Sequence, residues 1–397
     1  MTDSLLRFRG EFPILATTNY LVSNSLGAMP RAVSGQLAEY ASEWETKGVR
    51  AWAQGWWDMP VRVGDEIAPL IGAGAGEVAM VPNVSIAQAQ VFSALTYDAG
   101  GRDTIVMTEL DFPSVRYVYD ELATRLGARI VVVPSDDGIS IDEDRLIAAI
   151  DERCRLVAIS HVLFRSAYIV DVARVAAHAH RMGALVSLDA YHSVGIVPVD
   201  VNAIGADFLT GGVLKWLCGG PGGCFLWVKP EVSAAHAPSL TGWQAHEHPF
   251  AFDPGMTYAT GAWRWLTGTP SIPALFAAVP GPRIVREAGM DAIRAKSIRQ
   301  TTRLIELADE RGFQVTAPRD SARRGGTVAF DVPHAREVAQ ALLAREVIVD
   351  YRPGAGIRVA PHFYTSDTEV EGVVAMIDEI LASDAWKPFV DTTLVVT

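Results

Sequence analysis

The central part of the chain alternates between two hydrophobic periodicities, and this alternation restricts the fold more than any other feature of the sequence. Between about Val81 and Val228, short runs rich in β-branched residues predict strands: DTIVMTE, ARIVVVPS, CRLVAISHV, ALVSLDA, ADFLTGG and GCFLWVK. Segments of helical periodicity lie between them, such as PSVRYVYDELATRLG and VARVAAHAHRMG. Alternating strands and helices predict an α/β fold, with a mostly parallel sheet covered by helices on both faces.

The sequence beyond Gly281 has a different texture. A long helical stretch, EAGMDAIRAKSIRQTTRLIELADERG, precedes two strand-like pieces, GGTVAFDV and VIVDYRPGAGIRVA, and a final helix, DTEVEGVVAMIDEILAS. This pattern predicts a smaller α+β domain. The first 50 residues also lack the strand–helix rhythm. We therefore expect residues 51–281 to form the large domain, and residues 1–50 and 282–397 to form the small one.

Composition argues against several classes of protein. The net charge is −12 and no basic run occurs, so we expect no nucleic-acid partner. The N-terminus lacks a signal-peptide pattern and no stretch reaches the ~18 apolar residues of a membrane span, so we expect a cytoplasmic protein with no membrane contact. The three cysteines lack CxxC spacing, which argues against disulfides and against a thiolate zinc site; we expect no metal.

Polar residues follow two of the predicted strands directly, where open α/β sheets bind ligands. Asp189 ends the run ALVSLDA, and His192 lies three residues further on. A carboxylate at this position can hold the proton of a pyridinium ring and keep that ring electron-withdrawing. Lys215 follows the run ADFLTGG in an apolar, glycine-rich setting, which favours a neutral amine able to form an imine.

A third group, Asn83, Val84 and Ser85, lies at a predicted helix start, where free backbone N–H groups suit a phosphate. Each group alone has an ordinary structural explanation: Asp189 as a turn residue, Lys215 as a surface lysine, and Asn83 as a helix cap. Their order and spacing together favour a pyridoxal 5'-phosphate site.

Longer segments resemble kynureninase, within the class V branch of the fold-type I pyridoxal-phosphate enzymes. The resemblance covers nearly the whole chain, in family order: YLVSNSLGAMPRAV, AQGWWDMPVRVGDEIAPLIGAGAGEVAMVPNVS, HVLFRSAYIVD, LDAYHSVGIVPVD, LKWLCGGPGG, LTGWQAHEHPFAFDP, LTGTPSI and GIRVAPHFYTS. It implies an aspartate-aminotransferase-like large domain with a smaller α+β domain, bound pyridoxal 5'-phosphate, an amino-acid substrate, and a homodimer with the active site at the subunit interface.

The resemblance also implies roles for single residues. Lys215 would be the Schiff-base lysine, Asp189 the partner of the pyridine nitrogen with His192 close to it, and Phe112 the residue stacked on the ring. Arg358 would bind the α-carboxylate of the substrate, a bidentate task that suits guanidinium geometry. The phosphate contacts would come from Val84, Ser85 and Trp243, and the substrate side-chain pocket from Trp56, Asn24, Ser25 and Thr269, the last of which we also assign to the cofactor.

Three positions depart from the family pattern. Kynureninases usually carry a tyrosine immediately before the lysine, which contacts the phosphate and is implicated in protonating Cβ, whereas this chain has Leu214. A second carboxylate is usual three residues after the stacking phenylalanine, where this chain has Val115. Tyr191 stands where a small residue is more usual; it either supplies a phenol from another direction or is a packed aromatic residue.

The resemblance implies hydrolysis of the Cβ–Cγ bond of L-kynurenine, or of a related aryl-keto amino acid, to an anthranilate-type acid and alanine. Because of Leu214, an alternative is another class V reaction on an amino acid: transamination, β-elimination or epimerisation. A cysteine desulfurase is disfavoured, because it needs a mobile thiol and no cysteine follows Cys224. A degenerate fold that acts as a binding module is a third alternative, against which the retained Lys215, Asp189 and Arg358 argue.

Overall fold

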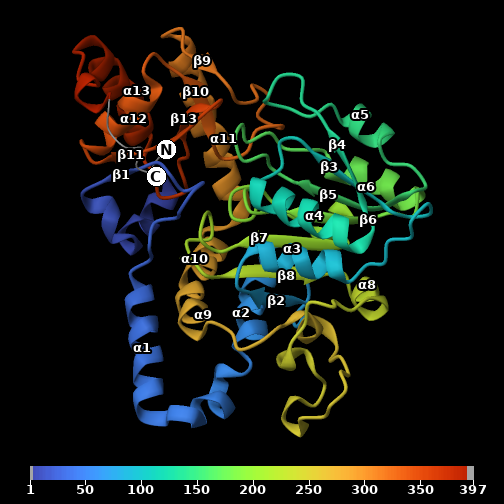
Figure 1. The fold of residues 1–397 in the computed structure, drawn as a ribbon. Coiled ribbons are helices and arrows are strands. Elements are labelled where there is room, and N and C mark those ends of the chain that lie inside the picture. The colour runs from blue at the N-terminus through green and yellow to red at the C-terminus, as the bar shows by residue number, and fades with distance from the viewer. Residues whose placement is uncertain (1–2, 391–397) are drawn as a thin grey trace.

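A seven-stranded sheet with helices on both faces forms the centre of the structure, a computed structural model that describes residues 3–390 (Figure 1). The strand order is β2-β8-β7-β6-β5-β3-β4, and all neighbours are parallel except β8, which is antiparallel to both β2 and β7. The predicted α/β fold with a mostly parallel sheet is confirmed, and each predicted run contains a strand. The strands are β2 (Val78–Val81), β3 (Thr104–Thr108), β4 (Arg129–Val133), β5 (Cys154–Ser160), β6 (Leu185–Asp189), β7 (Phe208–Gly212) and β8 (Cys224–Val228).

Side chains of the sheet alternate between two hydrophobic clusters. In β5, Leu156 packs in the cluster under α3 (Val84–Ser93) and α4 (Pro113–Leu126), and its neighbour Val157 packs in the cluster on the opposite face. That opposite face is covered by α2 (Met59–Ile67) and α6 (Val172–Arg181). A strand covered on both faces has no solvated side, which explains why these runs are apolar throughout rather than alternating.

Local signals in the sequence set the helix ends beside the sheet. The helix α4 has Pro113 at its first position and ends at Gly127, which adopts a left-handed φ of 72°. The helix α6 is capped by the carboxylate of Asp171, which accepts a hydrogen bond from the Arg174 N–H at 3.2 Å. The other short α-helices around the sheet are α5 (Glu143–Ala148), α7 (Val201–Ile204), α8 (Pro230–Ala235) and α9 (Ile272–Ala278).

The C-terminal part of the chain forms a second hydrophobic core around a four-stranded antiparallel sheet of order β12-β13-β10-β9. The expected strand piece 347–360 forms three strands, β11, β12 and β13. Pro353 and Gly354 (φ 76°) turn the chain between β12 and β13, which pair with each other in antiparallel fashion. The expected helix 287–312 begins only at Met290, because Gly289 (φ 85°) separates it from α10 (Pro280–Ala288), whose Val285 and Ala288 pack in the core of the large sheet. The other elements of this part of the chain are β9 (Gln314–Val315), β10 (Val328–Asp331), β11 (Val347–Ile348), β12 (Asp350–Arg352), β13 (Gly356–Val359), α11 (Met290–Asp309), α12 (Ala335–Leu343) and α13 (Asp367–Ala382).

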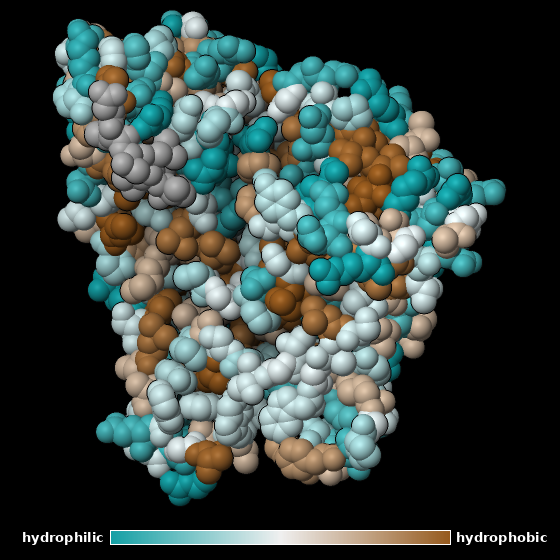
Figure 2. All heavy atoms as spheres, in the orientation of Figure 1, coloured by the Kyte–Doolittle hydropathy of each residue, from teal (hydrophilic) through white to brown (hydrophobic). Residues whose placement is uncertain are grey.

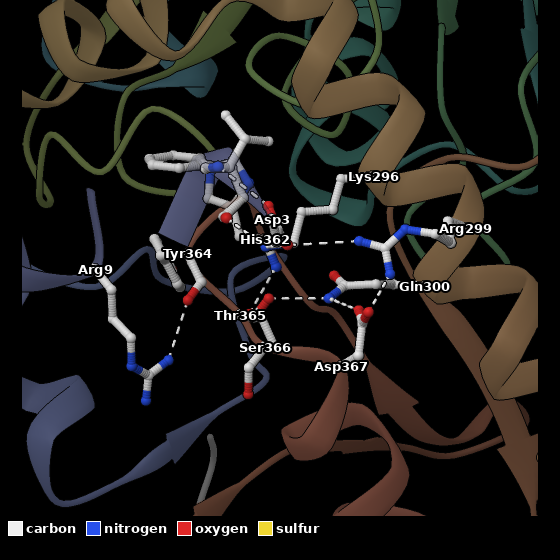
Figure 3. Close-up of polar contacts among 12 residues, drawn as sticks. Asp3, Arg9, Lys296, Arg299, Gln300, His362, Tyr364, Thr365, Ser366 and Asp367 are labelled. Carbon is white, nitrogen blue, oxygen red and sulfur yellow. Dashed lines mark hydrogen bonds and ion pairs between the residues drawn. The ribbon is translucent and has the colours of Figure 1, made fainter. Parts of the chain in front are cut away.

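The N-terminal segment is fastened to this second core. Its strand β1 (Asn19–Tyr20) pairs in parallel with β11. Figure 3 shows Asp3 directed at Lys296 of α11, where the carboxylate and the amine lie 2.7 Å apart, and Arg9 donating to the carbonyl of Tyr364 at 3.0 Å. The chain then runs into α1 (Ala32–Lys47), which extends down one side of the molecule and packs against α9, with the rings of Tyr40 and Phe276 5.9 Å apart (Figure 1). The exact domain limits at 51 and 281 stay a prediction.

No helix within residues 3–390 combines the length and the apolar character that crossing a membrane would require.

One close backbone contact locks α10 against the segment that follows Lys215. A Cβ added at Gly281 would lie 1.9 Å from the carbonyl oxygen of Leu217. We therefore expect Gly281→Ala to lower the free energy of unfolding by about 1–3 kcal/mol, the usual cost of overpacking. Thermal and denaturant unfolding followed by circular dichroism measure the change. The control is Gly372→Ala in α13, where a Cβ meets no atom within 4 Å; equal melting curves for the two variants would contradict the prediction.

Candidate active site

The candidate site lies at one edge of the large sheet because five strands end there. The strands β3, β5, β6 and β7 run in parallel, and β2 shares their direction because β2 and β7 are both antiparallel to β8. The residues that follow β2, β3, β5, β6 and β7 are therefore brought to the same edge. A cavity of about 200 Å³ opens among them, lined by Val84, Phe112, Ser160, Val162, Phe164, Asp189, Tyr191, His192, Leu214 and Lys215.

The Lys215 amine is held at the cavity wall in a largely apolar environment. It lies 2.5 Å from Nε2 of His192, and 5.6 Å from the ring centroid of Phe112. Burial lowers the pKa of Lys215 to about 7, aided by the charge of Arg358 and opposed by that of Asp189. A large fraction of the amine is therefore neutral near neutral pH, which is the state that attacks a carbonyl carbon.

Asp189 ends β6 and is 6% exposed. Its carboxylate accepts the N–H of Tyr191 at 2.9 Å. Burial raises the pKa of Asp189 to about 6, and the Lys215 charge opposes this rise. Burial also keeps the pKa of His192 well below its ordinary value, so its imidazole is neutral and its Nε2 shares a hydrogen bond with the Lys215 amine. The site thus holds a carboxylate, a neutral imidazole and a partly neutral amine.

Asp111 is a site residue that the sequence analysis missed. It precedes Phe112, is buried, and accepts the N–H groups of Thr108 and Ser160, both at 2.7 Å. These bonds tie the ends of β3 and β5 together and set where Phe112 leaves the sheet. Because Asp111 follows a predicted strand, the rule that identified Asp189 could have found it.

The start of α3 supplies the predicted phosphate-binding segment. The side-chain oxygen of Asn83 accepts the Ile86 N–H at 3.1 Å, so this residue caps the helix. Val84 lines the cavity, and Ser85 lies in the same first turn. The unpaired N–H groups and positive dipole end of a helix favour an anion at this position.

Arg358 reaches the site from the second core. It is 2% exposed, forms an ion pair with Asp350 directly across the β12–β13 hairpin, and donates to the carbonyl of Phe164, which lines the cavity. Arg352 contacts the other oxygen of Asp350 at 2.7 Å. Two guanidinium groups against one carboxylate leave a net positive charge, and Arg358 Nε has no partner among the described residues. This arrangement suits a substrate carboxylate.

The N-terminal segment packs on the backbone of the lysine loop. The N–H of Gly27 donates to the carbonyl of Leu214 at 2.7 Å, and a Cβ on Gly27 would lie 2.2 Å from the Lys215 carbonyl oxygen. Asn24 and Ser25 belong to this segment. The Asn24 side chain is 1% exposed, and neither atom of its amide has a partner within residues 3–390. A buried amide without partners is costly, so a ligand that satisfies it gains affinity.

Eight predicted residues do not line the Lys215 cavity: Asn24, Ser25, Asn83, Ser85 and Arg358, described above, and Trp56, Trp243 and Thr269. Trp56 stacks on Tyr40 with ring centroids 5.3 Å apart, and its indole N–H donates to Glu43 at 2.7 Å. Trp243 and Thr269 line a second cavity of about 620 Å³. The structure therefore does not bring these three residues together with Lys215.

Comparisons with known proteins agree with this geometry. The profile of the aminotransferase class-V family matches residues 19–373. The chain is 34% identical over 397 residues to kynureninase of Burkholderia pseudomallei (strain 1106a), and 35% identical over 398 residues to kynureninase of Pseudomonas fluorescens. Both alignments cover 97% of this chain and 94% of the relative.

Solved structures share the fold. An apo cysteine desulfurase from Thermococcus onnurineus NA1 is 24% identical, with a TM-score of 0.83 over 95% of this chain and 98% of that chain. A lysine-to-alanine mutant of C-DES with glycine covalently linked to its pyridoxal-phosphate cofactor is 20% identical, with a TM-score of 0.85 over 93% of this chain and 98% of that chain. The fold-type I expectation is confirmed.

The residues present fit pyridoxal 5'-phosphate. The cavity combines a half-buried amine, a buried carboxylate and an aromatic face, and a helix N-terminus lies at its edge. No carboxylate within residues 3–390 forms a salt bridge with Lys215, so its amine is not engaged in an ion pair. Lys215 and Asp189 would hold the aldehyde end and the ring nitrogen, and the first turn of α3 the phosphate.

The lowered pKa of Lys215 predicts how cofactor loading depends on pH. Only the neutral amine attacks the aldehyde, so the rate of loading should rise between about pH 6 and pH 8 and then level off, because the pKa is about 7. An ordinary lysine, of pKa ~10.4, would load faster up to about pH 10. Stopped-flow absorbance of cofactor-free protein mixed with pyridoxal 5'-phosphate gives the profile.

The control for this profile is Asp189→Asn. Since the Asp189 charge raises the pKa of Lys215, its removal should move the midpoint to lower pH. A midpoint near pH 10 in the parent protein, or a shift upward in the variant, would contradict the assignment.

Proposed function

The chain belongs to the aminotransferase class-V family as a kynureninase-like, pyridoxal-5'-phosphate-dependent enzyme, and we propose that it hydrolyses the Cβ–Cγ bond of L-kynurenine or a related aryl-keto amino acid. The products would be an anthranilate-type acid and alanine. The observation that carries the proposal is full-length similarity to kynureninases. It is supported by Lys215 and Asp189, which line one cavity, and by Arg358, which donates to the carbonyl of the lining residue Phe164.

The cofactor supplies an aldehyde that condenses with amines and a ring that withdraws electrons from the amino-acid Cα. Arg358 binds the α-carboxylate, helped by the net positive charge that it shares with Arg352 and Asp350. The carboxylate of Asp189 keeps a proton on the ring nitrogen. The neutral amine of Lys215, oriented by its hydrogen bond to His192, accepts the proton from Cα.

The pocket for the substrate side chain is formed only in part by the residues of one chain. The amide of Asn24 has no partner among the described residues and would hydrogen-bond a polar substituent of the substrate. Phe164, which lines the cavity, would provide an apolar face. An aryl ketone has both features. Trp56 would join the pocket only across a subunit interface.

Leu214 supports a second candidate function. It lines the cavity and carries no polar atom, so the acid that would protonate Cβ after hydrolysis is absent at this position. A class V reaction without that step, such as transamination, β-elimination or epimerisation of an amino acid, uses the same lysine and arginine. These alternatives differ from hydrolysis in their products.

The test is an assay of the loaded enzyme with L-kynurenine, 3-hydroxykynurenine and a panel of amino acids, with and without a keto-acid acceptor. We expect an anthranilate-type product and alanine, independent of the acceptor, and no turnover by Lys215→Ala, because no other lining residue carries an amine. Acceptor-dependent exchange of amino groups, with no aromatic acid, would instead establish a transaminase.

We also propose that two copies of the chain complete each site. The helix α1 buries only Val33 and exposes Leu37 and Trp44. Val49, which follows the helix, is also exposed. Near the end of the helix lie the exposed Trp243, Phe250 and Phe252, and Figure 2 shows brown and tan side chains at this lower end of the molecule. Apolar surface of this extent favours association. The cytoplasmic location expected from the sequence stays a prediction.

A hybrid dimer tests whether the site is shared. We expect Lys215→Ala and Trp243→Ala to be nearly inactive alone, whereas a hybrid with one copy of each regains about half of the parent activity, because one of its two sites is intact. Co-expression with two affinity tags isolates the hybrid. An inactive hybrid, or a monomer by sedimentation, would contradict the shared site; each variant carrying both tags is the control.

A further inference from the structure

The aromatic side chain of Tyr191 lies in the cavity but has no part in the chemistry described above. It stands between Asp189 and His192, and its ring centroid is 5.6 Å from the Lys215 amine. The backbone N–H of this residue holds the Asp189 carboxylate at 2.9 Å, so the start of the side chain is fixed relative to the site.

A gap at Gly212 determines where the ring of Tyr191 lies. A Cβ on Gly212 would be 2.1 Å from Cε1 of Tyr191 and 2.7 Å from its hydroxyl oxygen. Any other residue at 212 would therefore displace the ring. Gly212 pairs with Cys224 across the sheet, and Cys224 pairs with Val81 on its other side. The ring thus extends along this row of residues, from the end of β6 toward the end of β2.

The hydroxyl of Tyr191 ends at the first turn of α3. Its oxygen interacts with the backbone N–H of Val84, and its other polar neighbour is the thiol of Cys224. Burial holds the pKa of Tyr191 well above its usual range, so the phenol keeps its proton. Burial also raises the pKa of Cys224 to about 12, so that neighbour is a neutral thiol, which is a weak acceptor. Within residues 3–390 the structure records no hydrogen bond from the phenolic O–H to a strong acceptor, and this donor lies beside a helix N-terminus.

Leu214 offers no equivalent group. It lines the cavity immediately before the lysine, and its side chain contains only carbon atoms. A phosphate at the first turn of α3 would meet the N–H group of Ser85 and the phenol of Tyr191, because the Val84 N–H already faces the phenol oxygen.

We propose that the Tyr191 hydroxyl donates a hydrogen bond to the phosphate of the bound cofactor, and that Gly212 is the residue that allows it to do so. The inference rests on the pyridoxal-phosphate site and not on the identity of the amino-acid substrate. It assigns Tyr191 to cofactor binding, beside the helix N–H groups.

The test compares two ligands that differ only in the phosphate. Cofactor-free parent protein and Tyr191→Phe are titrated with pyridoxal 5'-phosphate and with pyridoxal, with binding followed by the quenching of tryptophan fluorescence and by visible absorbance. Because a hydrogen bond to a charged group is lost, we expect the Kd for pyridoxal 5'-phosphate to rise at least about tenfold. The Kd for pyridoxal should stay within about twofold, because packing of the ring is kept.

Two further variants sharpen the comparison. Gly212→Ala keeps the phenol but should displace it, and is expected to weaken pyridoxal 5'-phosphate more than pyridoxal. Tyr117→Phe, at a tyrosine that is 67% exposed, is the matched control and should change neither.

Unchanged affinity of Tyr191→Phe for pyridoxal 5'-phosphate, or an equal loss for both ligands, would overturn the proposal. Equal loss would indicate that the residue only packs against the ring. Since the titration measures binding alone, a failure to hydrolyse kynurenine would leave its result intact.

Discussion

The chemistry of the candidate site depends on the partial removal of the Lys215 amine from bulk water. Burial disfavours the charged form of the amine and of the Asp189 carboxylate alike, and moves their pKa values toward each other, to about 7 and about 6. An amine in this range is available as a nucleophile and as a base near neutral pH. The sheet topology brings these two groups together. The strands β6 and β7 are parallel, so Lys215, in the loop between β7 and the antiparallel β8, lies at the edge where β6 ends with Asp189.

The second hydrophobic core contributes a positive charge, that of Arg358, next to the sheet edge that carries Lys215 and Asp189. Arg358 is held on β13 by Asp350, and the loop after β13 reaches back to the lysine segment, where His362 Nε2 contacts the carbonyl of Trp216 at 2.8 Å. Figure 3 shows that loop fixed on its other side, with the Gln300 amide donating to the Thr365 carbonyl at 2.9 Å. The arginine and the lysine are therefore positioned by one continuous set of contacts, although 143 positions separate them in the chain (358 − 215).

The parts that could be predicted from sequence are those with a local cause. Buried strands with both faces covered give continuous apolar runs, and polar residues directly after such runs identified Asp189 and Lys215. Asp350 was missed because its role comes from pairing across a hairpin whose turn at Pro353 was not recognised. The relation of Tyr191 to Gly212 depends on the register of three strands. Trp56, Trp243 and Thr269 lie outside the Lys215 cavity because their surroundings are set by distant elements: Trp56 packs on Tyr40, and the other two line a separate cavity.

The central claim is that the amine of residue 215 is the one that binds the cofactor. Reduction of the loaded enzyme with borohydride fixes any imine as a stable secondary amine, and peptide mass mapping then locates it. We expect the pyridoxyl-phosphate modification on the peptide that contains Lys215 and on no other lysine. A modification elsewhere, or an unmodified Lys215 in fully loaded and reduced protein, would contradict the account.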